Sequence, residues 1–86
     1  MAYSLGYKKS VQRDLKRLSK SEANRILNLI EKELIKNPES NAVLKGKFRG
    51  LRKYRVGDYR VIYIIMETEI LILRIGHRRD VYKREI

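Results

Sequence analysis

The chain has 86 residues, and its 21 Lys and Arg outnumber its 10 Asp and Glu, which gives a formal net charge of +11 at pH 7. We expect residues 1–86 to form one domain with a thin core, and such a basic balance is typical of proteins that meet polyanions or acidic proteins. The absence of cysteine excludes disulfides, thiolate zinc sites and cysteine nucleophiles, and it fits the cytoplasm, where we expect the protein to act.

An N-terminal strand is predicted over residues 2–8, where aromatic or aliphatic side chains alternate with small or polar ones. From Lys8 the period lengthens, because Val11, Leu15 and Leu18 recur at intervals of four and three residues, as on one face of a helix. The remaining faces of this short predicted helix are basic.

A second helix is predicted to begin at Ser19, because Glu22 stands three residues later, the spacing of a capping box. Pro38 cannot continue a helix, so residues 8–36 are predicted to form a helical hairpin. Residues 37–50 contain turn-forming residues and two glycines, which indicates a loop with at most a short strand.

Three β-branched or aromatic runs follow at residues 51–56, 59–66 and 69–75, and short polar segments separate them. Adjacent antiparallel strands joined by hairpins are the simplest solution, with a frayed or short helical tail after Gly76. The second and third runs are apolar at nearly every position. Helices cover only one face of such a sheet, so the tail or a partner must cover the other face. No run approaches the ~20 apolar residues of a membrane span, and we expect no membrane contact.

The basic residues concentrate between positions 45 and 60, where one acid, Asp58, faces seven of them. They are Lys45, Lys47, Arg49, Arg52, Lys53, Arg55 and Arg60. Strand alternation places Lys53 and Arg55 on one face, and a hairpin brings Arg60 near them. His77 and Arg78 follow the last strand and extend the cluster. The alternative is that strand ends are solvated and a basic protein places its charges there.

Two motifs carry a family resemblance, "YRVGDYRVIY" at residues 54–63 and "GHRRDVY" at residues 76–82. With the strand, the helical hairpin and "LKG" before them, the whole chain resembles the RelE/ParE superfamily of toxins, and in particular its RelE-type endoribonucleases. The resemblance implies a small α+β fold in which a helical hairpin packs on a twisted antiparallel sheet of about four strands, followed by a short C-terminal tail.

The resemblance also implies a function, which is entry into the ribosomal A site and cleavage of messenger RNA there, so that translation is inhibited. A cognate RelB-like antitoxin would wrap and neutralise the toxin, which would account for both the apolar sheet and the basic balance. Operator DNA would be bound only through the antitoxin complex.

Residue by residue, the catalytic lysine of the family falls on Lys53, its arginine of the next strand on Arg60, its arginine after the sheet on Arg78, and its C-terminal tyrosine on Tyr82. The chain departs from the family pattern at Leu51, where well-studied members have a second lysine. The spacing from Arg78 to Tyr82 is also shorter than in some members.

Metal-independent RNA cleavage needs a base for the 2′-hydroxyl, positive charge for the phosphorane oxygens and an acid for the departing 5′-oxygen. Arg60 is the first choice for the phosphorane, because a planar guanidinium grips two phosphate oxygens. Arg78 would neutralise charge on the leaving group. The base stays open between Lys53, whose neutral form the surrounding cations favour, and His77, because an imidazole titrates near neutral pH. Tyr82 would stack on a base or share in proton transfer.

Further basic side chains are candidate phosphate contacts: Lys45, Lys47, Arg49, Arg52, Arg55, Arg74 and Arg79. One histidine and no cysteine leave too few ligands for a metal site, and we expect no cofactor. Two alternatives remain. One is a ParE-like toxin that inhibits DNA gyrase, and the other is a non-catalytic module whose basic patch only holds RNA.

Overall fold

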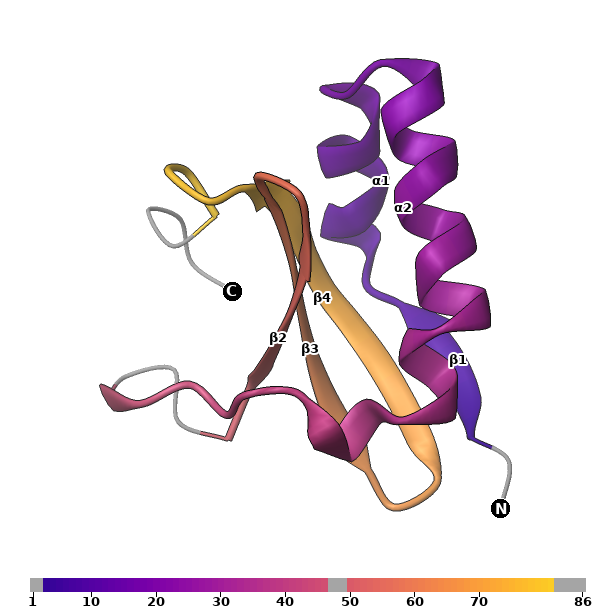
Figure 1. Ribbon diagram of the computed structural model, residues 1–86, viewed down its shortest axis with the longest axis vertical. Coiled ribbons are helices and arrows are strands. Elements are labelled where there is room, and N and C mark those ends of the chain that lie inside the picture. The colour runs from indigo at the N-terminus through magenta and orange to yellow at the C-terminus, as the bar shows by residue number, and fades with distance from the viewer. Residues whose placement is uncertain (1–2, 47–49, 82–86) are drawn as a thin grey trace.

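The computed structural model describes residues 3–46 and 50–81. The elements follow one another as β1 (Ser4–Tyr7), α1 (Lys9–Lys16), α2 (Lys20–Lys32), the 3₁₀ turns η1 (Leu34–Lys36) and η2 (Pro38–Ser40), β2 (Arg52–Val56), β3 (Tyr59–Met66) and β4 (Glu69–His77) (Figure 1). The predicted helical hairpin, loop and three C-terminal strands are confirmed. The predicted cap of α2 is confirmed as well, since the Ser19 hydroxyl accepts a hydrogen bond from the Glu22 N–H at 3.2 Å.

The four strands form one sheet in the order β1-β4-β3-β2. β2, β3 and β4 pair antiparallel through tight hairpins, as predicted, whereas β1 pairs parallel to β4. The sheet is therefore mixed rather than wholly antiparallel. Along the chain, two helices lie between β1 and the other strands, and parallel pairing requires such a long crossover. Alternation within residues 2–8 did not predict the direction of this strand, because alternation is the same in parallel and antiparallel strands.

Both helices lie on one side of the sheet and cover that face (Figure 1). The core between them is built from buried apolar side chains: Val11, Ile26, Ile30, Leu34, Val56, Val61, Tyr63, Ile70, Ile72 and Ile75. None of the helices in the described parts of the chain is long and apolar enough to cross a membrane.

The opposite face of the sheet is covered only in part by the described residues. Val81, in the turn after β4, is 2% exposed and lies over Gly76, where a Cβ on the glycine would stand 3.4 Å from the Val81 Cβ. Ile62 is fully buried, but Ile64, Leu71 and Leu73 are only half-buried. Among the described residues, Val81 thus covers one end of this apolar face, and the rest of the face stays half-buried.

The loop before β2 is fastened to the sheet by a buried phenol. The Tyr63 hydroxyl donates to the Pro38 carbonyl oxygen and accepts from the Asn41 side-chain amide at 2.9 Å. Val43 forms an isolated bridge with Arg52, which is the short strand-like contact that the sequence allowed. These bonds fix the first part of the loop that connects η2 to β2 against the sheet.

Candidate functional site

Three cations share the face of the sheet that turns away from the helices. Val56, Tyr59 and Val61 pack in the core on the helix side, so the alternating residues Arg55 and Arg60 point the other way. Arg55 is the cross-strand partner of Arg60, and Lys53 is the partner of Ile62 one step along the same face. We call Lys53, Arg55 and Arg60 the cationic face. The strand alternation predicted this juxtaposition.

Arg60 is the most enclosed member of the cationic face, with 8% of its surface exposed. One guanidinium nitrogen, Nη1, donates to the carbonyl oxygens of Gly57 at 3.2 Å and Tyr59 at 3.1 Å. Within residues 3–46 and 50–81, no carboxylate pairs with it, and none of its polar atoms is both buried and without a partner. In the described part of the chain its hydrogen bonds thus come from Nη1 alone, and no carboxylate balances its charge, so the guanidinium could bind an anion.

Arg78 is anchored to the same hairpin turn as Arg60. Its backbone N–H donates to the Asp58 carbonyl oxygen at 2.8 Å, and its Nε lies 4.0 Å from the Asp58 carboxylate. Gly57 gives this turn its backbone geometry with a φ of 59°. Adjacent carbonyls of one turn thus bind the Arg60 guanidinium, at Gly57, and the Arg78 backbone N–H, at Asp58.

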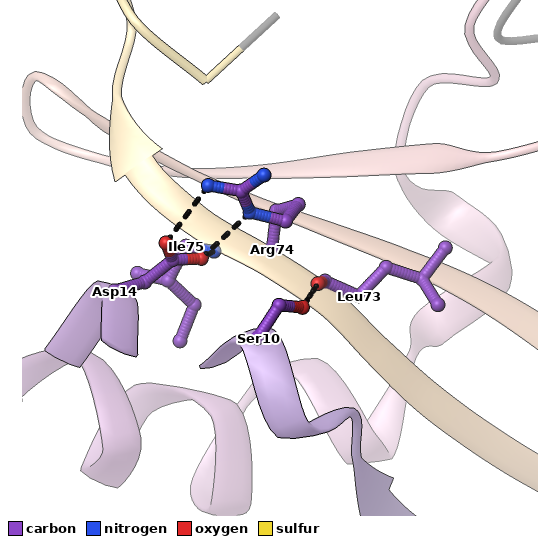
Figure 2. A network of polar contacts seen from close by, with 5 residues as sticks. All are labelled: Ser10, Asp14, Leu73, Arg74 and Ile75. Atoms are coloured by element: carbon purple, nitrogen blue, oxygen red, sulfur yellow. Dashed lines mark hydrogen bonds and ion pairs between the residues drawn. The ribbon is translucent and has the colours of Figure 1, made fainter. Parts of the chain in front are cut away.

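Arg74 is occupied by an ion pair. Its Nε and Nη2 donate to the two oxygens of Asp14, each at 2.9 Å, and Asp14 is 4% exposed (Figure 2). This bidentate contact raises the pKa of the Arg74 guanidinium further above its ordinary range. The same carboxylate accepts the Ile75 N–H at 2.9 Å, and Ser10 donates to the Leu73 carbonyl at 2.9 Å.

Asp14 and Ser10 therefore replace a neighbouring strand. β1 pairs with β4 only as far as Ile72, and beyond that point side chains of α1 satisfy the edge of β4 (Figure 2). Asp14 was not among the residues predicted from the sequence. The available signal was its position three residues after Val11, on the apolar stripe of a basic helix, where an acid is buried only if it is paired.

Arg52 is also engaged within the fold. Its Nη1 donates to the carbonyl oxygens of Glu39 at 3.0 Å and Asn41 at 2.8 Å, so it holds the loop that leads into β2. Its strand neighbour Tyr63 lies in the core on the helix side. Arg52 and Arg74, both candidate phosphate contacts by sequence, thus have structural partners.

His77 stands apart from the cationic face. It is the cross-strand partner of Tyr59, and the two rings meet edge to face with centroids 5.8 Å apart. Because Tyr59 packs on the helix-side core, alternation puts His77 on the side of the sheet opposite Lys53 and Arg60. His77 Nδ1 accepts a hydrogen bond from the Arg79 N–H at 3.2 Å.

A pocket of about 450 Å³ opens on this helix-side end of the sheet. His77 and Tyr59 line it together with Arg17 of α1 and the Asp14–Arg74 pair. Arg79 and Lys45 are exposed at the surface, whereas Lys47, Arg49 and Tyr82 lie outside the described residues. In the parts of the chain that are described, no group of three or more His, Asp or Glu could hold a metal ion.

Comparison with known proteins agrees with this architecture. The model of a protein family described as the ParE toxin of the type II toxin-antitoxin system parDE matches residues 5–82. The toxin RelG of Mycobacterium tuberculosis is 29% identical, over 98% of this chain and 100% of its own length.

Solved structures show the same similarity. The toxin-antitoxin complex RelBE2 of Mycobacterium tuberculosis contains a chain with a TM-score of 0.84 and 26% identity, covering 91% of this chain and all of that one. The archaeal RelE-RelB complex of Pyrococcus horikoshii OT3 contains a chain that is 31% identical, with a TM-score of 0.66, covering 94% of this chain and all of that one.

The family model covers most of the sheet and both helices, and the fold agrees with RelE-like toxins in the order and packing of these elements. This chain therefore belongs to the ParE toxin family, within the RelE/ParE superfamily of type II toxin-antitoxin toxins.

Proposed function

We propose that this toxin is a metal-independent endoribonuclease that cleaves messenger RNA in the ribosomal A site and so inhibits translation in the cytoplasm. The observation that carries the proposal is Arg60. It is almost enclosed on the cationic face, and in the described part of the chain it lacks a carboxylate partner and makes hydrogen bonds through Nη1 alone. Holding an unpaired guanidinium there costs free energy, which an anionic substrate would offset.

The proposed chemistry is an internal transfer at phosphorus. The 2′-hydroxyl loses its proton to a base and attacks the adjacent phosphate, the bond to the 5′-oxygen breaks, and that oxygen takes up a proton. The products are a cyclic phosphate and a 5′-hydroxyl. Arg60 would stabilise the phosphorane oxygens, and Arg78 the charge on the leaving oxygen.

Lys53 is the base that the geometry favours. It lies on the same face as Arg60, whereas His77 lies on the other side of the sheet. Arg55, the cross-strand partner of Arg60, lies two residues along β2 from Lys53 and adds a further cation to the same face. Tyr82 would stack on a nucleobase next to the scissile phosphate.

Cleavage of messenger RNA programmed into the A site of ribosomes tests the proposal. We expect Arg60→Ala and Arg78→Ala each to lower the rate about a hundredfold or more, because each removes a preorganised cation from the transition state. Arg13→Ala, a matched loss of one exposed arginine on α1, should cleave like the wild type. A folded wild-type protein that leaves the A-site codon intact would refute the proposal.

A second candidate rests on the family name, which is that of ParE toxins. Inhibition of DNA gyrase, measured as loss of supercoiling, would then replace RNA cleavage. This activity should survive Arg60→Ala and Arg78→Ala, so the same variants separate the two candidates.

The proposed partner is a RelB-like antitoxin, as in the RelE-RelB complex of Pyrococcus horikoshii OT3. The half-buried Ile64, Leu71 and Leu73 offer apolar surface for it beside the cationic face. An acidic antitoxin would neutralise part of the +11 charge, and the complex, rather than the free toxin, would bind operator DNA.

A further inference from the structure

We propose that Asp58 is a positioning residue that holds Arg78 in the free protein and releases it to an RNA phosphate. This inference rests on the proposed function, because it concerns the same phosphate-binding face. It assigns a role to the one acid within the most basic stretch of the chain, residues 45–60.

The geometry gives Asp58 two contacts with Arg78. Its carbonyl oxygen accepts the Arg78 N–H at 2.8 Å, which fixes the backbone of the tail to the β2–β3 turn. Its carboxylate lies 4.0 Å from the Arg78 Nε, near enough for charge attraction but too far for a hydrogen bond. Arg78 is therefore kept in place while its guanidinium donors stay available.

The exposure of the pair makes it easy to displace. The Arg78 side chain is 52% exposed and that of Asp58 is 69% exposed. Ion pairs of this kind contribute little to stability, and an RNA phosphate flanked by Arg60 offers a guanidinium a shorter contact. A buried pair such as Asp14–Arg74, at 2.9 Å and with three hydrogen bonds on its carboxylate, could not exchange partners in this way.

The position of the turn is a second reason to expect that Asp58 competes with RNA for Arg78. The Gly57 carbonyl oxygen accepts from the Arg60 guanidinium and the Asp58 carbonyl oxygen accepts from the Arg78 N–H, so both proposed phosphate contacts are bound to one turn, and the Asp58 carboxylate belongs to that turn. In the free protein its negative charge offsets part of the positive charge there. When RNA binds, the phosphate takes over that role, and the carboxylate becomes a competitor for Arg78. Part of the affinity of Arg78 for RNA is therefore masked.

A double-mutant cycle on RNA binding measures the competition directly. The probe is a short single-stranded oligoribonucleotide with 2′-O-methyl groups, which binds but cannot be cut. We expect Arg78→Ala to weaken binding at least about threefold more in the Asp58→Asn background than in the wild type, the size of coupling found for interacting side chains. In the Asp58→Glu background, which keeps the negative charge, Arg78→Ala should weaken RNA binding only as much as it does in the wild type.

A matched cycle provides the control. Glu31→Gln removes one exposed negative charge from α2, away from the turn, and should leave the cost of Arg78→Ala unchanged. The proposal would be overturned if Arg78→Ala weakened RNA binding equally in the Asp58→Asn and wild-type backgrounds, or less in the Asp58→Asn background. Urea unfolding of each variant checks that it folds. Because the Asp58 side chain is 69% exposed, we expect its substitutions to leave the fold intact.

The cycle separates this inference from the proposed function. A wild type that binds the probe but does not cleave in the A site refutes the nuclease and leaves the cycle valid. Cleavage by the wild type together with additive binding energies refutes the role of Asp58 alone. A wild type that does not bind the probe at all refutes the role of Asp58 in RNA binding, and cleavage in the A site still decides the proposed function.

Discussion

Asp14 illustrates how one buried acid organises the end of a strand that leads into proposed functional residues. Its two oxygens accept from two nitrogens of Arg74 and from the Ile75 N–H, and both charged side chains are nearly buried. Gly76, His77 and Arg78 follow directly, so the pair fixes the strand from which the proposed leaving-group cation emerges.

Asp14→Leu should destabilise the fold by about 3 kcal/mol, because it removes the carboxylate that binds two nitrogens of Arg74 in a site that water barely reaches. Asp14→Leu combined with Arg74→Met should recover most of that loss. Urea unfolding gives both values. Arg25→Gln is the matched control, since it breaks the exposed pair with Glu22 and should cost at most about 0.5 kcal/mol. If Asp14→Leu alone were as stable as the Arg25→Gln control, this account of Asp14 would be contradicted.

Tyr63 links the pH dependence of stability to the loop before β2. Burial raises the pKa of its phenol above the ordinary value of 10.0. The unfolded chain therefore loses this proton at a lower pH than the folded chain. The contribution of Tyr63 to stability is complete below pH 10.0 and is lost as the pH rises through the raised folded pKa.

Tyr63→Phe should lower the free energy of unfolding at neutral pH by about 1–2 kcal/mol, because the Asn41 amide and the Pro38 carbonyl lose their partner. Above pH 10.0 the same variant should lose stability less steeply than the wild type. Some slope remains, since the phenols of Tyr3, Tyr7 and Tyr54 also have raised pKa values. Urea unfolding at neutral and alkaline pH tests this, and parallel curves would count against it.

At the scale of elements, the two hairpin turns of the sheet differ in how they obtain a positive φ. The turn between β2 and β3 has Gly57 at 59°, which glycine adopts without steric cost. The turn between β3 and β4 places Glu67 at 57°, where a side chain is strained. The proposed functional turn is therefore the relaxed one, and the strain lies at the opposite end of the sheet.

Glu67→Gly should raise the free energy of unfolding by about 0.5 kcal/mol, because relief of the strained φ exceeds the entropy that glycine adds to the unfolded chain. Thr68→Gly is the matched control in the same turn. Thr68 does not have a positive φ, so this change should only lower stability. Thermal unfolding of the two variants distinguishes them. If both lose stability, Glu67 is not strained.

For the whole molecule, local periodicity predicts much of the fold and part of the site. Alternation and apolar spacing predicted the strands and the helical hairpin, and strand parity placed Lys53, Arg55 and Arg60 on one face. The parallel direction of β1 was not predictable, because a long crossover permits either direction and alternation within a strand does not distinguish them.

The alternation of side chains along β4 is interrupted where the ladder is irregular. The register of β3 and β4 shifts between Ile62 and Tyr63, so Arg74 pairs with Ile62, while Ile72 pairs with Tyr63. Arg74 consequently does not share a face with Ile70 and Ile72, as strict alternation would require, and it reaches Asp14 at the strand edge. A single extra residue in one strand is invisible to a period of two.

The charge distribution indicates a compromise between stability and binding. The molecule carries a net +11, and Arg55 and Arg60 stand directly opposite each other across β2 and β3. Like charges at such positions repel, so the cationic face destabilises the free fold. Selection for folding alone would replace the exposed Arg55 with a neutral residue, whereas the proposed binding of phosphate would keep it.

Arg55→Gln should therefore raise the free energy of unfolding at low salt by about 0.5 kcal/mol and at the same time weaken RNA binding. Arg13→Gln removes the same charge from exposed α1 and should change both quantities less, because it has no cation opposite it on a strand. Urea unfolding and binding of the 2′-O-methyl RNA, each at low and high salt, measure the two effects. High salt should reduce the stabilisation by Arg55→Gln, since it screens the repulsion between the guanidinium groups. Equal effects of the two variants would mean that net charge alone, rather than its placement on the cationic face, governs both stability and binding.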